Sequence, residues 1–204
     1  MLPQHFLGRK PSHFNVHPIV KAYIISESFL WGAWNLFTPI FAIFLVEKIK
    51  GGNIELAASG FSVYLVSRVV FELISGRLLV GSGDARKLFM AIIGMLCVSA
   101  GYLGFAYANT IGEVFFYYVV LGLGLGLSMP AQCALFSIHL DPKKEVTEWS
   151  FADALQFLCM ALTTALGGFI ASQYGFSFLF LLAGAINTIG ILPYLLLLTY
   201  PKNK

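Results

Sequence analysis

Charged side chains are scarce in this chain. Asp, Glu, Lys and Arg make up 11% of its 204 residues, whereas 58% of the residues are hydrophobic. A soluble domain of this length would need a much larger charged surface, because a small fold leaves most of its surface in contact with water. The composition therefore excludes a soluble globular fold and predicts that lipid surrounds most of the protein.

Chemically reactive clusters are lacking as well. The chain has no basic stripe with interleaved aromatic residues, so we expect no nucleic-acid partner. Its three cysteines, Cys97, Cys133 and Cys159, lie inside apolar runs and share no metal-ligand spacing. Ser62 follows a glycine but has no evident histidine partner. We therefore predict no catalytic residue, no metal site, no cofactor and no enzymatic activity.

Long apolar segments are abundant instead. A membrane-spanning helix needs about 20 mostly apolar residues, and six segments qualify, at approximately 20–46, 57–79, 88–108, 111–137, 149–171 and 176–199. The lead-in 1–19 has no signal-peptide pattern, the membrane domain covers 20–200, and 201–204 form a short tail. We predict an all-α integral membrane protein, a bundle of six transmembrane helices.

The basic residues gather on one side of the predicted bundle, where positive charge marks the cytoplasmic face. That side holds Arg9, Lys10, Lys21, Arg77, Arg86, Lys87, Lys143, Lys144, Lys202 and Lys204. The other side holds Lys48 and Lys50. We expect a multi-pass protein of the plasma or inner membrane with both termini in the cytoplasm.

Small residues and prolines interrupt two of the predicted helices. The first contains Pro39, and the fourth contains the run LGLGLGLSMP. Small residues four apart let helices approach closely in lipid. Because Gly122 with Gly126 and Gly124 with Ser128 lie on two faces of the fourth helix, we expect it to be pressed between neighbours.

The turn between the second and third segments, ISGRLLVGSGDARKLF, resembles the signature of the major facilitator superfamily. That signature has a glycine, an acidic residue four positions on, a second glycine seven positions on, and then basic residues. The matching positions are Gly76, Gly83, Arg86 and Lys87. Val80 occupies the acidic position and Asp84 is displaced. The resemblance implies a gating turn on the cytoplasmic side.

Two further stretches resemble the same family. GLGLGLSMPAQCALFSIHLDPKKEVTEWSFADA is similar to its fourth span, loop and fifth-span start, and ALGGFIASQYGFSFLFLLAGAI to its fifth-to-sixth hairpin. Full members have twelve spans in two six-span halves, each a 3+3 repeat. The resemblance therefore implies that this chain is one half, and we expect it to pair with a second six-helix chain.

Polar residues recur at helical spacing in four of the six segments. A charge in the bilayer costs ~2.5–3.5 kcal/mol on insertion scales, so these residues need partners or a water-filled cavity. Candidates for the pathway are Glu27, Trp31, Asn35, Arg68, Glu72, Ser128, Gln132, Asp153 and Gln156. The third and sixth segments are nearly free of ionisable residues and are predicted to face lipid. The resemblance implies that the second and fifth helices face the other half.

Several interpretations stay open from the sequence. Arg68 and Glu72 could be a neutralised structural pair, and Glu27 could reach water at its helix end. In a transporter, Glu27 is our preferred proton carrier, and Trp31 with Trp34 favours an organic solute over a bare ion. We predict a secondary transporter of a small solute, acting as a homodimer through its second and fifth helices. The alternatives are a subunit of a heteromeric transporter and a non-transporting assembly factor or sensor.

Overall fold

The computed structural model describes residues 16–199. The predicted tail, most of the lead-in, and the basic residues Arg9, Lys10, Lys202 and Lys204 lie outside the described residues. Helices and short turns make up this part of the chain, with one isolated bridge between Lys50 and Thr110. The elements are α2 (Pro18–Phe37), η2 (Thr38–Ile40), α3 (Phe41–Lys48), α4 (Ile54–Leu78), α5 (Asp84–Tyr107), α6 (Ile111–Ile138), α7 (Glu145–Ile189) and α8 (Leu192–Thr199).

Five helical segments of the described chain are long and apolar enough to cross a membrane. They are Pro18–Lys48, Ile54–Leu78, Asp84–Tyr107, Ile111–Ile138 and Glu145–Thr199. The predicted all-helical membrane architecture is confirmed. The predicted fifth and sixth helices appear as the single segment of 55 residues, Glu145–Thr199.

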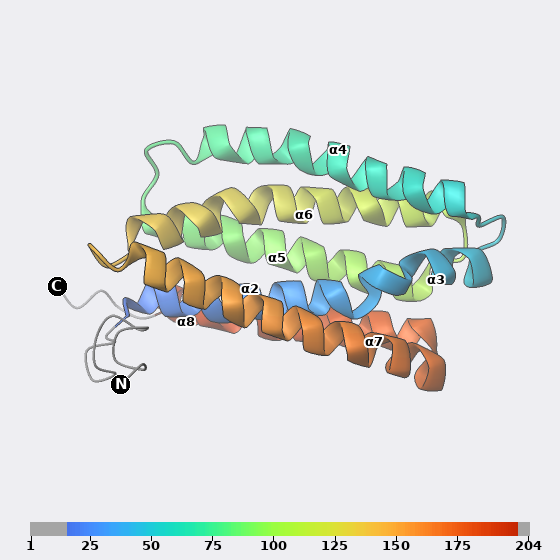
Figure 1. Cartoon of the computed structure of the whole chain (residues 1–204). Helices are drawn as coiled ribbons and strands as arrows, with labels where there is room; N and C mark the ends of the chain where they lie inside the picture. Colours follow the sequence, from blue (N-terminus) through green and yellow to red (C-terminus); the bar gives the residue numbers. More distant parts are fainter. Residues whose placement is uncertain (1–15, 200–204) are drawn as a thin grey trace, which may run out of the picture.

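That long segment reverses direction at Gly175. Its φ of 83° and ψ of 167° break the helix in a conformation that glycine adopts without steric cost. Directly after this residue, the ring of Phe176 lies 5.4 Å from that of Phe44, near the end of the first span. Gly190 then lies against Phe29, closer to the start of that span. The segment therefore runs back along α2, as Figure 1 shows.

The ends of several helices are fixed by local hydrogen bonds. Asn53 accepts from the backbone N–H of Leu56 at 2.8 Å and caps α4. Thr110 and Glu113 form a reciprocal capping box at the start of α6. The first span is interrupted at η2 by Pro39, because proline has no N–H for the helical ladder.

The helices lie roughly side by side in layers (Figure 1). α4 lies along one edge, α6 and α5 occupy the middle, and α2, α7 and α8 form the opposite edge. We call the end that carries the starts of α2, α5 and α7 and the ends of α4 and α6 the basic end. Its basic residues include Lys21, Arg77, Arg86, Lys87, Lys143 and Lys144.

The helix α5 is the most enclosed span of the described chain. In its most apolar stretch 61% of the residues are buried, against 17% for α4. The prediction that this third span faces lipid is therefore wrong for most of its surface. Gly94 of α5 lies so close to the carbonyl oxygen of Gly124 that a Cβ would overlap it. Small residues rather than polar ones mark this buried helix, since they permit close backbone packing.

The helix α6 is pressed between two neighbours, which confirms the prediction from its glycines. Gly122 and Gly126 lie against α4, where a Cβ would meet Ser67 and Phe71 at 2.6 Å. Gly124 lies against α5 on the other face. The two small-residue faces of α6 thus join α4 to the rest of the bundle.

Gly167 offers a test of the contact between α2 and α7. A Cβ there would overlap the carbonyl oxygen of Leu36, whereas a Cβ on the neighbouring Gly168 meets nothing within 4 Å. We expect Gly167→Ala to destabilise the bundle by roughly 1–3 kcal/mol, the usual cost of overpacking, and to lower the thermal midpoint in detergent. Gly168→Ala is the matched control and leaves the midpoint near that of the parent. Equal midpoints for both variants would show that the helices do not touch here.

Candidate functional site

Glu27 is a buried acid on α2, where it begins a polar stripe that continues through Trp31 and Asn35. It is 3% exposed, and its Oε2 accepts a hydrogen bond from Nε1 of Trp31 at 2.8 Å. Asn35 donates to the backbone oxygen of Trp31 at 3.0 Å, so the stripe is bonded largely within its own helix. The other carboxylate oxygen, Oε1 of Glu27, has no partner in the described part of the chain. A buried oxygen without a partner is costly, so this site suits a proton or a transient ligand.

Gln132 of α6 lies at the same level as Glu27. The rings of Tyr23 and Phe136 stack at 4.1 Å, and Glu27 and Gln132 lie one helical turn inward from them on their respective helices. Gln132 is fully buried, and within residues 16–199 neither its Oε1 nor its Nε2 has a hydrogen-bond partner. Glu27 and Gln132 are thus two buried polar groups with unused bonding capacity in one region of the bundle.

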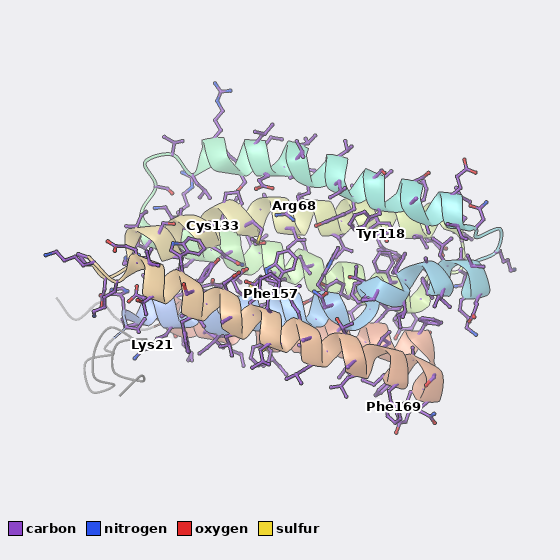
Figure 2. The ribbon with its side chains drawn as sticks, viewed as in Figure 1. Lys21, Arg68, Tyr118, Cys133, Phe157 and Phe169 are labelled. Atoms are coloured by element: carbon purple, nitrogen blue, oxygen red, sulfur yellow. The ribbon has the colours of Figure 1, made fainter. Side chains whose placement is uncertain are left out.

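Arg68 of α4 pairs on its own helix. Its Nε lies 3.2 Å from Oε2 of Glu72, and its Nη1 donates to the hydroxyl of Tyr64 at 3.2 Å. Figure 2 shows Arg68 between α4 and α6, and its charge lies near enough to interact with that of Glu27. The side chains of Arg68 and Glu72 are 24% and 43% exposed. The pair is therefore neutralised yet open toward the surface of the bundle.

The remaining predicted pathway residues are not gathered at this centre. Ser128 is buried at the contact with α5, where a Cβ on Gly94 would touch it. Asp153 is exposed and Gln156 is half-buried near the start of α7. The structure thus brings Glu27, Gln132 and Arg68 into one region, places Ser128 in a helix contact, and leaves Asp153 and Gln156 on an outer flank.

The predicted gating turn lies at the basic end. Gly76 lies within α4, close to its end. Arg86 is exposed. Lys87 is 7% exposed, and its Nζ donates to the backbone oxygen of Ser82. Gly83 is the residue before α5. The displaced acid Asp84 has a partner: its Oδ2 lies 3.1 Å from Nε2 of His139, at the end of α6.

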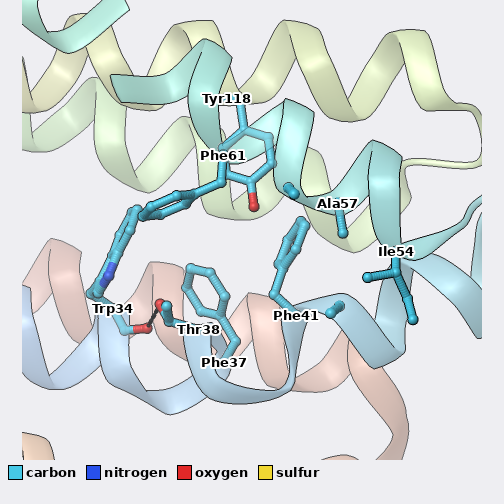
Figure 3. Close-up of a pocket in the computed structure, with 10 residues that line it drawn as sticks. Trp34, Phe37, Thr38, Phe41, Ile54, Ala57, Phe61 and Tyr118 are labelled. Carbon is cyan, nitrogen blue, oxygen red and sulfur yellow. Dashed lines mark hydrogen bonds between the residues drawn. The ribbon is translucent and has the colours of Figure 1, made fainter. Parts of the chain in front are cut away.

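An aromatic cavity opens at the other end of the bundle, beside the break in the first span. Its volume is about 340 Å³. Figure 3 shows Trp34, Phe37, Phe41, Phe61 and Tyr118 around it, contributed by α2, α3, α4 and α6. Trp34 also contacts Tyr64, with ring centroids 5.1 Å apart, and Tyr64 accepts from Arg68. A chain of side chains therefore links the cavity to the charged pair.

Sequence reasoning missed Asn187, which holds α5 against the last part of α7. It is fully buried, and its Nδ2 donates to the backbone oxygen of Met95 at 2.8 Å and to Oγ of Ser99 at 2.9 Å. Thr188 lies 3.0 Å from the same Ser99 oxygen. The available signal was a lone amide inside an otherwise apolar span, which in lipid commonly marks an interhelical hydrogen bond.

The family comparison matches this helical architecture. The family model described as Major Facilitator Superfamily matches residues 23–204. The chain belongs to the major facilitator superfamily. No curated protein matches the chain.

Membership confirms the resemblance seen in the gating turn and in the later spans. Members of this superfamily are generally transporters rather than enzymes, and they are multi-pass membrane proteins. Among residues 16–199, no three His, Cys, Asp or Glu side chains converge as a metal site. Membership in this superfamily therefore indicates a transporter in general.

Proposed function

We propose that this protein is a secondary transporter of a small organic solute and crosses the membrane six times. The reversal at Gly175 supports the sixth crossing, because it divides the 55-residue segment into two antiparallel runs. The excess of lysine and arginine at the basic end supports a cytoplasmic position for that end and for both termini. The membrane is then the plasma or inner membrane.

We further propose that two copies pair through α4 and the first part of α7, around a twofold axis along the membrane normal. The supporting observation is that polar groups remain open on these two helices of the isolated chain: Arg68 and Glu72 on α4, Asp153 and Gln156 on α7. Lipid tails cannot bond such groups. A second copy would enclose them around a shared polar pathway.

Cysteine cross-linking tests the pairing. In a background with Cys97, Cys133 and Cys159 replaced by serine, one chain carries Leu73→Cys on α4 and another carries Phe157→Cys on α7. These side chains are 72% and 58% exposed in the single chain, and Phe157 is labelled on α7 in Figure 2. We expect a cross-linked product of two chains in lipid, because the twofold arrangement brings α4 of one copy to α7 of the other.

The control pairs Leu73→Cys with Leu196→Cys on α8, which is 67% exposed and belongs to neither of the two helices proposed to form the interface. It should give no product. A single-chain mass in lipid, or equal cross-linking of both pairs, contradicts the homodimer. If the chain that carries Leu73→Cys is instead cross-linked to a different protein, the result supports the alternative, a subunit of a heteromeric transporter.

The aromatic cavity supports an organic substrate with a flat apolar ring. Of the two tryptophans on which the sequence-based preference for an organic solute rests, Trp34 lines the cavity and Trp31 does not; Phe37 lines it as well. Aromatic walls bind rings through offset and edge-to-face contacts, and pockets of this kind enclose most of a small ligand. Indole is a suitable first probe, and cyclohexanol tests whether the ring must be aromatic.

A substitution that fills the cavity tests its role. Ala58 lines the cavity, whereas the neighbouring Ser59 does not. We expect Ala58→Phe to raise the KM for uptake of the aromatic solute into proteoliposomes by about tenfold or more, the equivalent of roughly 1.4 kcal/mol. Ser59→Phe, the matched control, leaves the KM unchanged. Equal effects of the two variants would place the solute elsewhere.

Glu27 is the proposed proton carrier, because it is a buried acid with one unpartnered oxygen. We expect Glu27→Gln to abolish the dependence of uptake on an imposed pH gradient while leaving counterflow of the solute measurable, since the amide has the size of the protonated acid but cannot release a proton. Glu47→Gln, outside the polar centre, is the control. Gradient-driven uptake that survives in Glu27→Gln rules out this role.

A further inference from the structure

Two histidines meet an aspartate at the basic end of the bundle. The rings of His17 and His139 stack with centroids 4.6 Å apart and an interplanar angle of 27°. His17 precedes α2, His139 follows α6, and Asp84 begins α5. The cluster therefore ties together three helices that are far apart in the sequence.

His139 faces a hydrogen-bond acceptor with each of its ring nitrogens. Its Nδ1 lies 2.8 Å from the backbone oxygen of Leu135, and its Nε2 lies 3.1 Å from Oδ2 of Asp84. A neutral imidazole carries one N–H and one lone pair, whereas an imidazolium carries two N–H groups. Both contacts can be hydrogen bonds only when the ring holds the second proton. A neutral ring would turn a lone pair toward an oxygen.

His17 has the opposite requirement. Its Nδ1 accepts a hydrogen bond from the backbone N–H of Ile19 at 3.3 Å and so needs a free lone pair. Burial, and then the charge of His139, lower the pKa of His17 below its ordinary 6.5, although Asp141 and Asp84 act in the opposite direction. The folded chain thus takes up fewer protons here than the unfolded chain. The stabilising cap is present above pH 6.5 and is lost as the pH falls through the lowered value.

The other charged groups around the cluster are engaged elsewhere. On the loop before α7, Asp141 pairs with Nζ of Lys144 at 2.5 Å, and its backbone N–H donates to Glu148 at 3.1 Å. On α5, Lys87 donates to the backbone oxygen of Ser82. Asp84 therefore has His139 as its ion-pair partner within the described residues. One added proton, on His139, lets both of its ring nitrogens donate hydrogen bonds. A second added proton, on His17, would remove the lone pair that accepts from Ile19.

We infer that His139 is a proton-binding site, separate from Glu27. The imidazolium of His139 joins the start of α5 to the end of α6 and stacks on a neutral His17. The inference rests on the cluster alone and holds whether or not the protein is a transporter. Loss of the proton breaks one of the two contacts of His139. It thereby loosens the turn from Leu79 to Gly83, which leads into α5.

Nitrogen NMR of the full chain in lipid nanodiscs tests the protonation pattern directly. The four histidine signals are assigned by single substitutions, with His139→Gln and His17→Gln identifying the pair. At neutral pH we expect two protonated ring nitrogens for His139, because both face an acceptor, and one for His17, because its Nδ1 accepts from Ile19. A neutral His139, or a doubly protonated His17, overturns the inference. This measurement needs no substrate and uses the unaltered protein for its decisive signals.

Hydrogen exchange of the turn tests the consequence. After correction for intrinsic rates, the backbone amides of residues 79–83 should exchange several-fold faster at alkaline pH than at neutral pH in the parent chain. His139→Gln should abolish this pH dependence, because its side-chain amide can still donate to Asp84 but does not titrate. Asp84→Asn should give fast exchange at both pH values, and Asp141→Asn is the control that retains the parent pattern. Unchanged pH dependence in His139→Gln refutes the clamp.

Discussion

In a lipid environment every polar group of a chain must find its partner within protein or in enclosed water, and this constraint governs the arrangement of the bundle. Within each helix the backbone N–H and C=O groups bond to one another. The helices can therefore pack closely wherever their contacting residues are small. Gly94 and Gly124 bring α5 and α6 almost into backbone contact, and Gly167 does the same for α7 and α2. These contacts set the helix order, and the order decides which polar side chains can meet.

Against this background three of the buried polar side chains, Asn187, Glu27 and Gln132, differ in how they bond. Asn187 uses both amide hydrogens to bind Met95 and Ser99, so it acts as an interhelical tie. Oδ1 of Asn187, like Oε1 of Glu27 and both amide atoms of Gln132, has no partner in the described part of the chain. Unlike Asn187, however, Glu27 and Gln132 make no hydrogen bond to another helix there. A purely structural role would favour an apolar residue at such positions, because an unsatisfied buried group is costly. The polarity of Glu27 and Gln132, without a bond to another helix, is what supports a role in moving a proton or solute.

The two ends of the molecule differ in chemistry. One end has an aromatic cavity of about 340 Å³ beside the break at Pro39. The basic end has His17, His139 and Asp84 in contact across three helices. Val80 occupies the acidic position of the family signature, and the displaced acid Asp84 contacts His139 at the end of α6. Ring binding at one end and proton binding at the other are compatible with alternating access through a pathway between them.

The sequence by itself determined the membrane location, the helical class and the family, because apolar length and the glycine pattern are local properties of the chain. It also identified the glycines of α6 that contact two neighbours. Only the tertiary structure decided that α5 is buried rather than lipid-facing, since its small residues, and not its lack of charge, control how closely α6 approaches. Likewise, the pairing of Asp84 with His139 joins residues 55 positions apart, and no helical spacing encodes such a contact. Local pattern specifies which segments enter the membrane, whereas packing between segments specifies which side chains meet there.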